Sequence, residues 1–174
     1  MRGVASGGAS DVVTVARTRL PALGRRGGGW VAGQGLLLIA AVGAGLIGAA
    51  WPSSAGPWLA AAGGAAALAG VGLLLAGGAG LGRQLTPFPR PAGEGALRRS
   101  GIYGRVRHPM YGGALLLLLG WALLSSPLAL LPLAVAAGFL EAKRRREEAW
   151  LLQRYQGYAA YRLLVRRRFI PYVW

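Results

Sequence analysis

The chain has 174 residues, of which 54% are hydrophobic and 30 are glycine, and it carries a formal net charge of +15. Lys and Arg outnumber Asp and Glu by 20 to 5, yet residues 27–82 and 109–140 contain none of these four residue types. This segregation excludes a soluble enzyme with one mixed surface, and the long apolar runs exclude a basic disordered protein. Such runs predict an all-α, polytopic integral membrane protein.

The first uncharged run is too long for one membrane crossing, which takes about 20 residues. A turn-forming, proline-containing segment lies near its middle, between Trp51 and Trp58, and tryptophan is typical of the membrane interface. We therefore predict transmembrane helices over about 30–50 and 58–82, preceded by a basic N-terminal segment, residues 1–29.

Glycine and alanine are abundant in these two helices. Small residues recur at four-residue spacing, as in Ala66/Gly70 and Gly78/Gly82. This spacing predicts close packing between helices within the membrane.

The second uncharged run, residues 109–140, is also long for one crossing. A single helix of this length would extend roughly 48 Å, beyond a bilayer core of about 30 Å. Ser125, Ser126 and Pro127 form a turn signal within it. We predict a short hairpin of helices over about 110–125 and 127–142, followed by a cytosolic C-terminal helical segment.

The basic residues are distributed in a way that predicts the topology. The N-terminal segment has five, the 83–108 loop six and the tail from residue 141 nine, while the two turns opposite have none. The positive-inside rule then predicts four crossings with both termini cytoplasmic. We expect the plasma membrane of a bacterium as the location and the lipid bilayer as a partner.

Two classes of site are not expected. A sequence pI near 11.8 suits nucleic-acid binding, but no zinc spacing, helix-turn-helix pattern or aromatic RNA-binding motif accompanies it, so we predict no nucleic-acid partner. The chain has no cysteine, which excludes disulfides and thiolate ligands, and we predict no metal site.

The first segment with reactive side chains surrounds the only histidine, His108. Pro109 suits the first turn of the following helix. Bare amides there, beside Arg107 and under Gly112 and Gly113, are typical of an anion-binding site. An interfacial helix cap with a snorkelling arginine is an alternative that the spacing leaves open.

The second segment begins with the pair Glu147 and Glu148. Arg144 precedes Glu148 by four residues and shares its helix face, and Tyr158 and Tyr161 are similarly paired. Taken alone, this segment is equally typical of an amphipathic helix on lipid headgroups, whose carboxylates neutralise neighbouring arginines.

The ordered elements Gly-x-Tyr-x-x-x-Arg-His-Pro-x-Tyr-x-Gly, an apolar hairpin, Glu-Glu-x-x-Leu-x-x-x-Tyr and Tyr-x-x-Tyr-x-x-x-Val-x-x-x-Phe-Ile-Pro follow one another in the chain. In this order they resemble the isoprenylcysteine carboxyl methyltransferase family, which is related to the membrane phospholipid methyltransferases. The resemblance extends over about residues 83–172 and makes residues 83–174 a methyltransferase-like region.

The resemblance implies an S-adenosylmethionine-dependent methyltransferase acting on a lipophilic or small acceptor, a carboxylate, thiol or amine, at the cytosolic membrane face. It implies catalytic roles for Arg144 and Glu148; Lys143 to Arg146 form a run, in which helical spacing to Glu148 favours Arg144. The residues that we assign to the cofactor on this basis are Tyr103, Arg107, His108, Pro109, Tyr111, Gly112, Gly113, Glu147, Glu148, Tyr158 and Tyr161.

Two other functions fit parts of the sequence. An NADPH-dependent membrane reductase of the sterol-reductase type can share the Arg-His-Pro-x-Tyr stretch, but the short chain and the tail from the glutamate pair favour the methyltransferase. A small transporter or scaffold would also be apolar, but residues 27–82 and 109–140 lack the charged residues that mark an ion path.

Overall fold

The computed structural model describes residues 20–90 and 95–174, whose regular elements are all helices with no strand, as predicted. Residues 1–19, which hold most of the predicted basic N-terminal segment, lie outside the described residues. The helices are α1 (Gly28–Ile47), α2 (Gly56–Leu81), α3 (Pro109–Ser125), α4 (Leu130–Arg154) and α5 (Tyr158–Leu164), with short 3-10 turns at Gly82–Gln84, Gly101–Gly104 and Pro127–Ala129.

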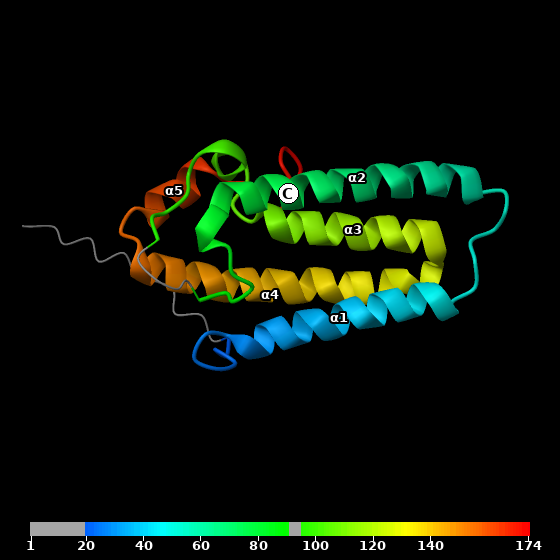
Figure 1. Cartoon of the computed structure of the whole chain (residues 1–174), viewed down its shortest axis with the longest axis horizontal. Coiled ribbons are helices and arrows are strands. Elements are labelled where there is room, and N and C mark those ends of the chain that lie inside the picture. The colour runs from blue at the N-terminus through cyan, green and yellow to red at the C-terminus, as the bar shows by residue number, and fades with distance from the viewer. Residues whose placement is uncertain (1–19, 91–94) are drawn as a thin grey trace, which may run out of the picture.

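The four long helices lie roughly parallel or antiparallel in an elongated bundle (Figure 1). Helix α2 packs along α3, and α4 packs along α1. The α1–α2 and α3–α4 turns lie together at one end of the bundle. The segment between α2 and α3, together with α5, lies at the other end, and all the candidate site residues belong to that end.

Within the described part of the chain, two helices are long and apolar enough to cross a membrane, by length and composition: Gly28–Ile47 and Gly56–Gln84. Their large apolar side chains face outward, including Leu36 and Ile39 on α1 and Leu68 and Leu75 on α2. An exposed apolar face of this extent is typical of contact with lipid rather than water. Helix α3 is apolar but only 17 residues long, so the four-crossing topology and the side of the termini remain predictions.

Helices α2 and α3 are brought together by a seven-residue glycine repeat. Gly63, Gly70 and Gly77 are the buried residues of α2. A Cβ on Gly70 would lie 2.8 Å from the carbonyl oxygen of Gly113, and a Cβ on Gly120 would lie 2.7 Å from that of Gly63. Close packing by small residues is thus confirmed, but with a period of seven rather than the predicted four.

The hairpin turn lies where the sequence predicts it. Helix α3 begins at Pro109 and ends at Ser125, and Ser126 accepts a hydrogen bond of 3.2 Å from the Leu128 amide. Helix α1 ends at Ile47, three residues before its predicted end, because the backbone adopts an extended conformation at Gly48. Gly48 lies so close to the Ser126 hydroxyl that it leaves no space for a side chain.

The largest difference from the predicted elements concerns α4. The fourth span was expected to end near residue 142, with a separate segment behind it, whereas α4 continues without a break to Arg154. Residues 141–153 are strong helix formers without Gly or Pro. Ion pairs one turn apart, such as Glu141–Arg144 at 2.6 Å, support the same helix. The glutamate pair therefore belongs to the same continuous helix as the predicted fourth span.

Candidate active site

Two segments that are far apart in the sequence meet beside the end of α4. The Arg107 amide donates to the Arg167 carbonyl at 3.1 Å, and the His108 amide donates to the Arg168 carbonyl at 2.7 Å. Pro109 disfavours helical backbone at the preceding residue, and His108 accordingly has φ −127° and ψ 62°. These bonds hold the His108 side chain against α4.

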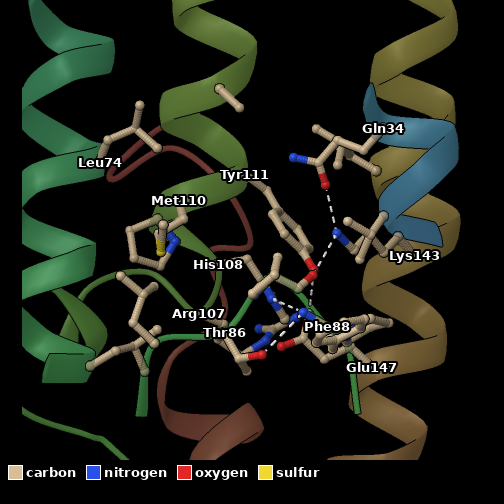
Figure 2. A pocket seen from close by; sticks show the side chains of 18 of the residues that line it. Gln34, Leu74, Thr86, Phe88, Arg107, His108, Met110, Tyr111, Lys143 and Glu147 are labelled. Atoms are coloured by element: carbon tan, nitrogen blue, oxygen red, sulfur yellow. Dashed lines mark hydrogen bonds and ion pairs between the residues drawn. The ribbon is translucent and has the colours of Figure 1, made fainter. Parts of the chain in front are cut away.

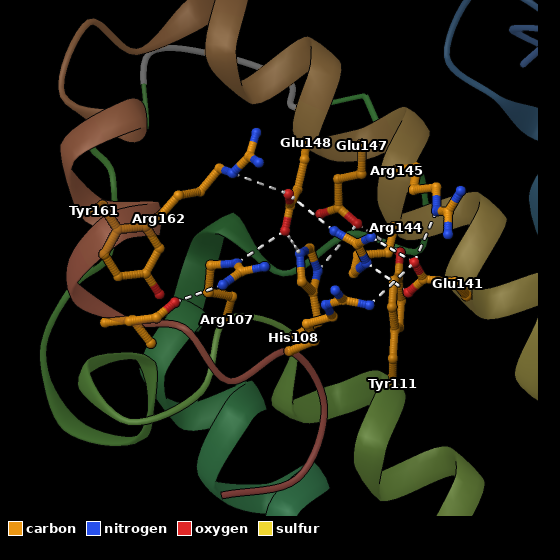
Figure 3. A network of polar contacts seen from close by, with 12 residues as sticks. Arg107, His108, Tyr111, Glu141, Arg144, Arg145, Glu147, Glu148, Tyr161 and Arg162 are labelled. Atoms are coloured by element: carbon orange, nitrogen blue, oxygen red, sulfur yellow. Dashed lines mark hydrogen bonds and ion pairs between the residues drawn. The ribbon is translucent and has the colours of Figure 1, made fainter. Parts of the chain in front are cut away.

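Glu148 is the centre of a buried network of charges (Figure 3). Its Oε1 accepts from Arg107 Nε at 2.9 Å and lies 3.1 Å from His108 Nε2. Its Oε2 lies 3.0 Å from Arg144 Nη1 and 3.5 Å from Arg162 Nε. Four cationic or polar groups from three segments of the chain thus converge on one carboxylate that is 3% exposed.

This environment determines the ionisation of Glu148. Burial alone would raise the pKa of the carboxyl group. The hydrogen bond from His108 and the charges of His108, Arg107 and Arg144 outweigh burial and hold the pKa of Glu148 well below its ordinary value. Glu148 is therefore a carboxylate throughout the physiological range.

The two arginines nearest Glu148 have their guanidinium groups engaged within the protein. Arg144 makes two hydrogen bonds with Glu141, at 2.8 and 2.6 Å, besides its contact with Glu148. Arg107 donates to the Val165 and Arg166 carbonyls at 2.6 and 3.0 Å. Both arginines therefore tie protein segments together.

Glu147 has a different environment from that of its neighbour. It accepts a hydrogen bond of 2.7 Å from the Tyr111 hydroxyl, and its Oε2 lies 3.6 Å from His108 Nδ1. Its side chain is 23% exposed, against 4% for Glu148. The His108 ring is thus held between the two glutamates and stacks on Tyr111, with ring centroids 5.4 Å apart.

Glu147 and Tyr111 face a cavity of about 770 Å³ (Figure 2). Its polar end is lined by charged and aromatic side chains from the 84–108 segment, α4 and α5. Its other end continues between the helices along apolar residues, among them Leu37, Leu118 and Leu140. The cavity thus joins the charged end of the bundle to its apolar interior.

Tyrosines form much of the polar end. Tyr161 donates to the Tyr103 carbonyl at 2.6 Å, and Tyr103 donates to the Gly77 carbonyl at 3.3 Å. Burial raises the pKa of Tyr161 to about 12. Of the smaller contributions, the charge of Arg107 lowers this pKa and that of Glu148 raises it. The Tyr158 and Tyr161 rings lie 5.7 Å apart. These rings are therefore neutral and fixed.

The predicted site residues fall into two groups in the structure. Eight line the cavity: Tyr103, Arg107, His108, Pro109, Tyr111, Glu147, Tyr158 and Tyr161. Arg144 and Glu148 lie in the network behind its wall, and Gly112 and Gly113 lie in helix packing contacts.

The predicted cradle of bare amides at Gly112 and Gly113 differs from the structure. The amides of Tyr111 and Gly112 donate to the His108 carbonyl at 3.1 and 3.2 Å. A Cβ on Gly112 would collide with the Phe169 carbonyl, and one on Gly113 would lie 2.8 Å from the Gly70 carbonyl oxygen. These glycines are required by close packing against the C-terminal segment and α2.

Sequence reasoning missed several cavity residues, notably Gln34, Lys143 and Tyr155. Lys143 is the only lysine, and Gln34 is a lone polar side chain within the apolar sequence of α1. These exceptions to the local composition are the sequence signal that could have identified both residues as candidate cavity residues. Tyr155 donates to the Gly95 carbonyl at 2.6 Å, and no local pattern indicates this partner.

Comparison with known proteins identifies the family of the chain. No curated protein and no solved structure matches it. The family model described as phospholipid methyltransferase matches residues 58–157, which include most of α2, all of α3 and α4, and both His108 and the glutamate pair. This match covers more than half of the chain and implies a methyltransferase. The chain belongs to the phospholipid methyltransferase family.

Proposed function

We propose that the protein is an S-adenosylmethionine-dependent methyltransferase that acts on a lipophilic acceptor at the cytosolic face of the membrane. The observation that carries this proposal is the single cavity with two kinds of wall, charged and aromatic at one end and apolar at the other. A methyl donor with several charged groups and an acceptor with an apolar chain require these two environments side by side.

The polar end suits this cofactor in size and chemistry. The cavity of about 770 Å³ lies within the range of about 300–1,000 Å³ for small-molecule sites. The cofactor supplies a methyl group on a positively charged sulfur. Glu147 offers a carboxylate to its cationic groups, and the aromatic side chains of Tyr103, Tyr158 and Tyr161 line the same end of the cavity.

We assign the recognition of the cofactor carboxylate to Arg98. Arg98 lines the cavity and is solvent-exposed. Arg144, for which the resemblance implies a catalytic role, is less suited to this contact, because its guanidinium is bound to Glu141 and Glu148. Arg144 and Glu148 then act as positioning residues, because they hold Arg107 and His108 in place.

The side chains at the site also limit the chemistry of the acceptor. A carboxylate or thiolate is already nucleophilic and needs only alignment and exclusion of water. An amine acceptor must first lose a proton, for which Glu147 and His108 are the candidate bases. The apolar wall excludes water from the acceptor end in either case.

Binding of S-adenosylhomocysteine to the purified protein in nanodiscs, measured by calorimetry, tests the proposal. We expect binding by the wild type and a loss of roughly ten- to a hundredfold in affinity for Glu147→Gln, which removes a charged partner. Arg167→Gln, which changes an exposed arginine outside the cavity, is the matched control and should bind as the wild type does.

The alternative reductase function gives a different result in the same assay. Binding of NADPH without binding of S-adenosylhomocysteine would overturn the proposal. Wild-type affinity of the Glu147→Gln variant for S-adenosylhomocysteine would remove Glu147 from the cofactor site and contradict our assignment of that end of the cavity.

A further inference from the structure

Lys143 is a buried ammonium group in the wall of the cavity. The residue is 2% exposed, and it lines the cavity together with Gln34 of α1. Its Nζ lies 2.6 Å from Gln34 Oε1 and 3.4 Å from the Pro87 carbonyl oxygen. Figure 2 shows Lys143, Gln34 and Tyr111 converging, with Nζ 5.2 Å from the centre of the Tyr111 ring.

The closest partners of this amine are two dipoles and a ring face, while the charge of Glu147, one turn further along α4, acts on it from a longer distance. Within residues 20–90 and 95–174, no carboxylate lies within 4.0 Å of Lys143, although the arginines nearby on α4 pair with Glu141 and Glu148. A buried charge without a counter-ion is unfavourable, and buried cations in proteins are normally paired. Burial lowers the pKa of Lys143 despite the charge of Glu147, so an anion bound in the cavity would stabilise the charged form of this amine.

The position of Lys143 is where the two walls of the cavity meet. Glu147 lies one helical turn further along α4 and belongs to the polar end. Leu140 lies one turn earlier and belongs to the apolar cluster with Leu115 and Ala136. A molecule with its chain along Leu140 would thus have its headgroup beside the ammonium of Lys143.

We propose that Lys143, held in place by Gln34, binds an anionic oxygen group, carboxylate or phosphate, of an amphiphilic acceptor. An ammonium group at this boundary favours an anionic headgroup and disfavours a cationic one. Lys143 is on this view a specificity residue for the acceptor. The binding of an anionic amphiphile at Lys143 does not depend on the proposed function. The statement that this amphiphile is the methyl acceptor does rest on the proposed function.

A series of amphiphiles with one chain and different headgroups tests this site. The full-length protein is placed in nanodiscs of neutral phospholipid, and radiolabelled palmitate is displaced with palmitate, hexadecyl phosphate, hexadecanol or hexadecylamine. We expect the wild type to bind the two anions roughly ten- to a hundredfold more tightly than the alcohol, and the amine most weakly. The tighter of the two anions distinguishes a carboxylate from a phosphate headgroup.

Variants at residue 143 separate charge recognition from a structural role. Lys143→Met should lose the preference for anions while binding hexadecanol as the wild type does, and Lys143→Arg should retain it. Arg145→Met removes a charge from the same helix at a side chain that is 63% exposed, so it should leave the preference unchanged. Retained anion preference in Lys143→Met would overturn the inference.

The outcomes for this site and for the proposed function are distinguishable. If Lys143→Met does not fold, the wild-type series alone decides, because equal affinity for palmitate and hexadecanol would contradict an anion site. Wild-type protein that binds S-adenosylhomocysteine but shows no headgroup preference refutes the role of Lys143 only. Anion preference without S-adenosylhomocysteine binding refutes the proposed function and leaves the anion site standing.

Discussion

The network around Glu148 and the cavity wall around Glu147 are built from adjacent residues of one helix, yet they differ in almost every physical property. Glu148 is surrounded by Arg107, His108 and Arg144 and is closed to solvent. Glu147 accepts one tyrosine hydrogen bond and lines the cavity. Successive residues of a helix point about 100° apart, so one glutamate faces the protein and the other faces the space that a ligand can occupy.

The site therefore contains residues that are important for stability and residues that are important for binding. The closed network joins the 105–108 segment, α4 and the C-terminal segment, so its residues should govern stability. The open wall makes few contacts within the protein, so its residues should govern binding. Substitutions that affect stability and binding separately test whether the two regions differ in this way.

The largest expected effect is that of Glu148→Gln on stability. Removing this carboxylate leaves buried Arg107 with an unpaired charge, while Arg144 keeps Glu141, and breaking a buried pair in this way typically costs about 3–5 kcal/mol. We expect the free energy of unfolding in detergent to fall by this amount, measured by denaturant or thermal unfolding. A variant as stable as the wild type that loses only cofactor affinity would place Glu148 with the open wall.

The pH dependence of stability provides a second measurement of the same network. The pKa of Glu148 is lowered in the folded protein, so its contribution is complete above the unfolded value of about 4.3. That contribution is lost as the pH falls below this value toward the folded pKa. The wild type should therefore lose stability more steeply than Glu148→Gln below about pH 4. Parallel pH curves would contradict the assignment.

Gly112→Ala is expected to have the next largest effect. The added methyl group would collide with the Phe169 backbone, which is held by hydrogen bonds to the C-terminal residue. Overpacking of this kind typically costs about 1–3 kcal/mol. Gly64→Ala, where no atom lies within 4 Å of the new Cβ, is the control and should be neutral or slightly stabilising. Equal stabilities of the two variants would show that Gly112 is not a packing residue.

Tyr161→Phe should have a smaller effect. It removes the hydrogen bond of 2.6 Å to the buried Tyr103 carbonyl, and we expect a loss of about 0.5–1.5 kcal/mol in thermal unfolding. Because burial raises the pKa of Tyr161 to about 12, the wild type should also be destabilised as the pH rises from about 10 toward that value. The phenylalanine variant should lack this part of the alkaline decline.

The smallest expected effect on stability is that of Glu147→Gln. The glutamine oxygen can still accept the Tyr111 hydroxyl, so we expect a change within about 0.5 kcal/mol. Circular dichroism melts of this variant and of Glu148→Gln give the direct comparison. A loss for Glu147→Gln as large as that for Glu148→Gln would show that the two glutamates belong to one structural unit.

Several features of the site were predictable because they depend on neighbours in the chain. His108 followed by Pro109 predicts an extended residue before a helix, and Arg144 four residues before Glu148 predicts their contact. The long-range partners were not predictable in this way. Gly112 resembles an open anion site in sequence, and only the distant Phe169 shows that it is a packing contact.

The sequence by itself determined the apolar helices, the gathering of charge into separate segments, and the residues that carry the family's pattern. The first two follow from composition and periodicity, and the third follows from the resemblance of the ordered motifs to a known family. The tertiary structure alone decided which glutamate faces the cavity, that Arg144 is engaged by Glu141, and that Lys143 meets Gln34 across the bundle. The physical reason is that side-chain direction along a helix acquires meaning only when the packing partners, often far along the chain, are in place.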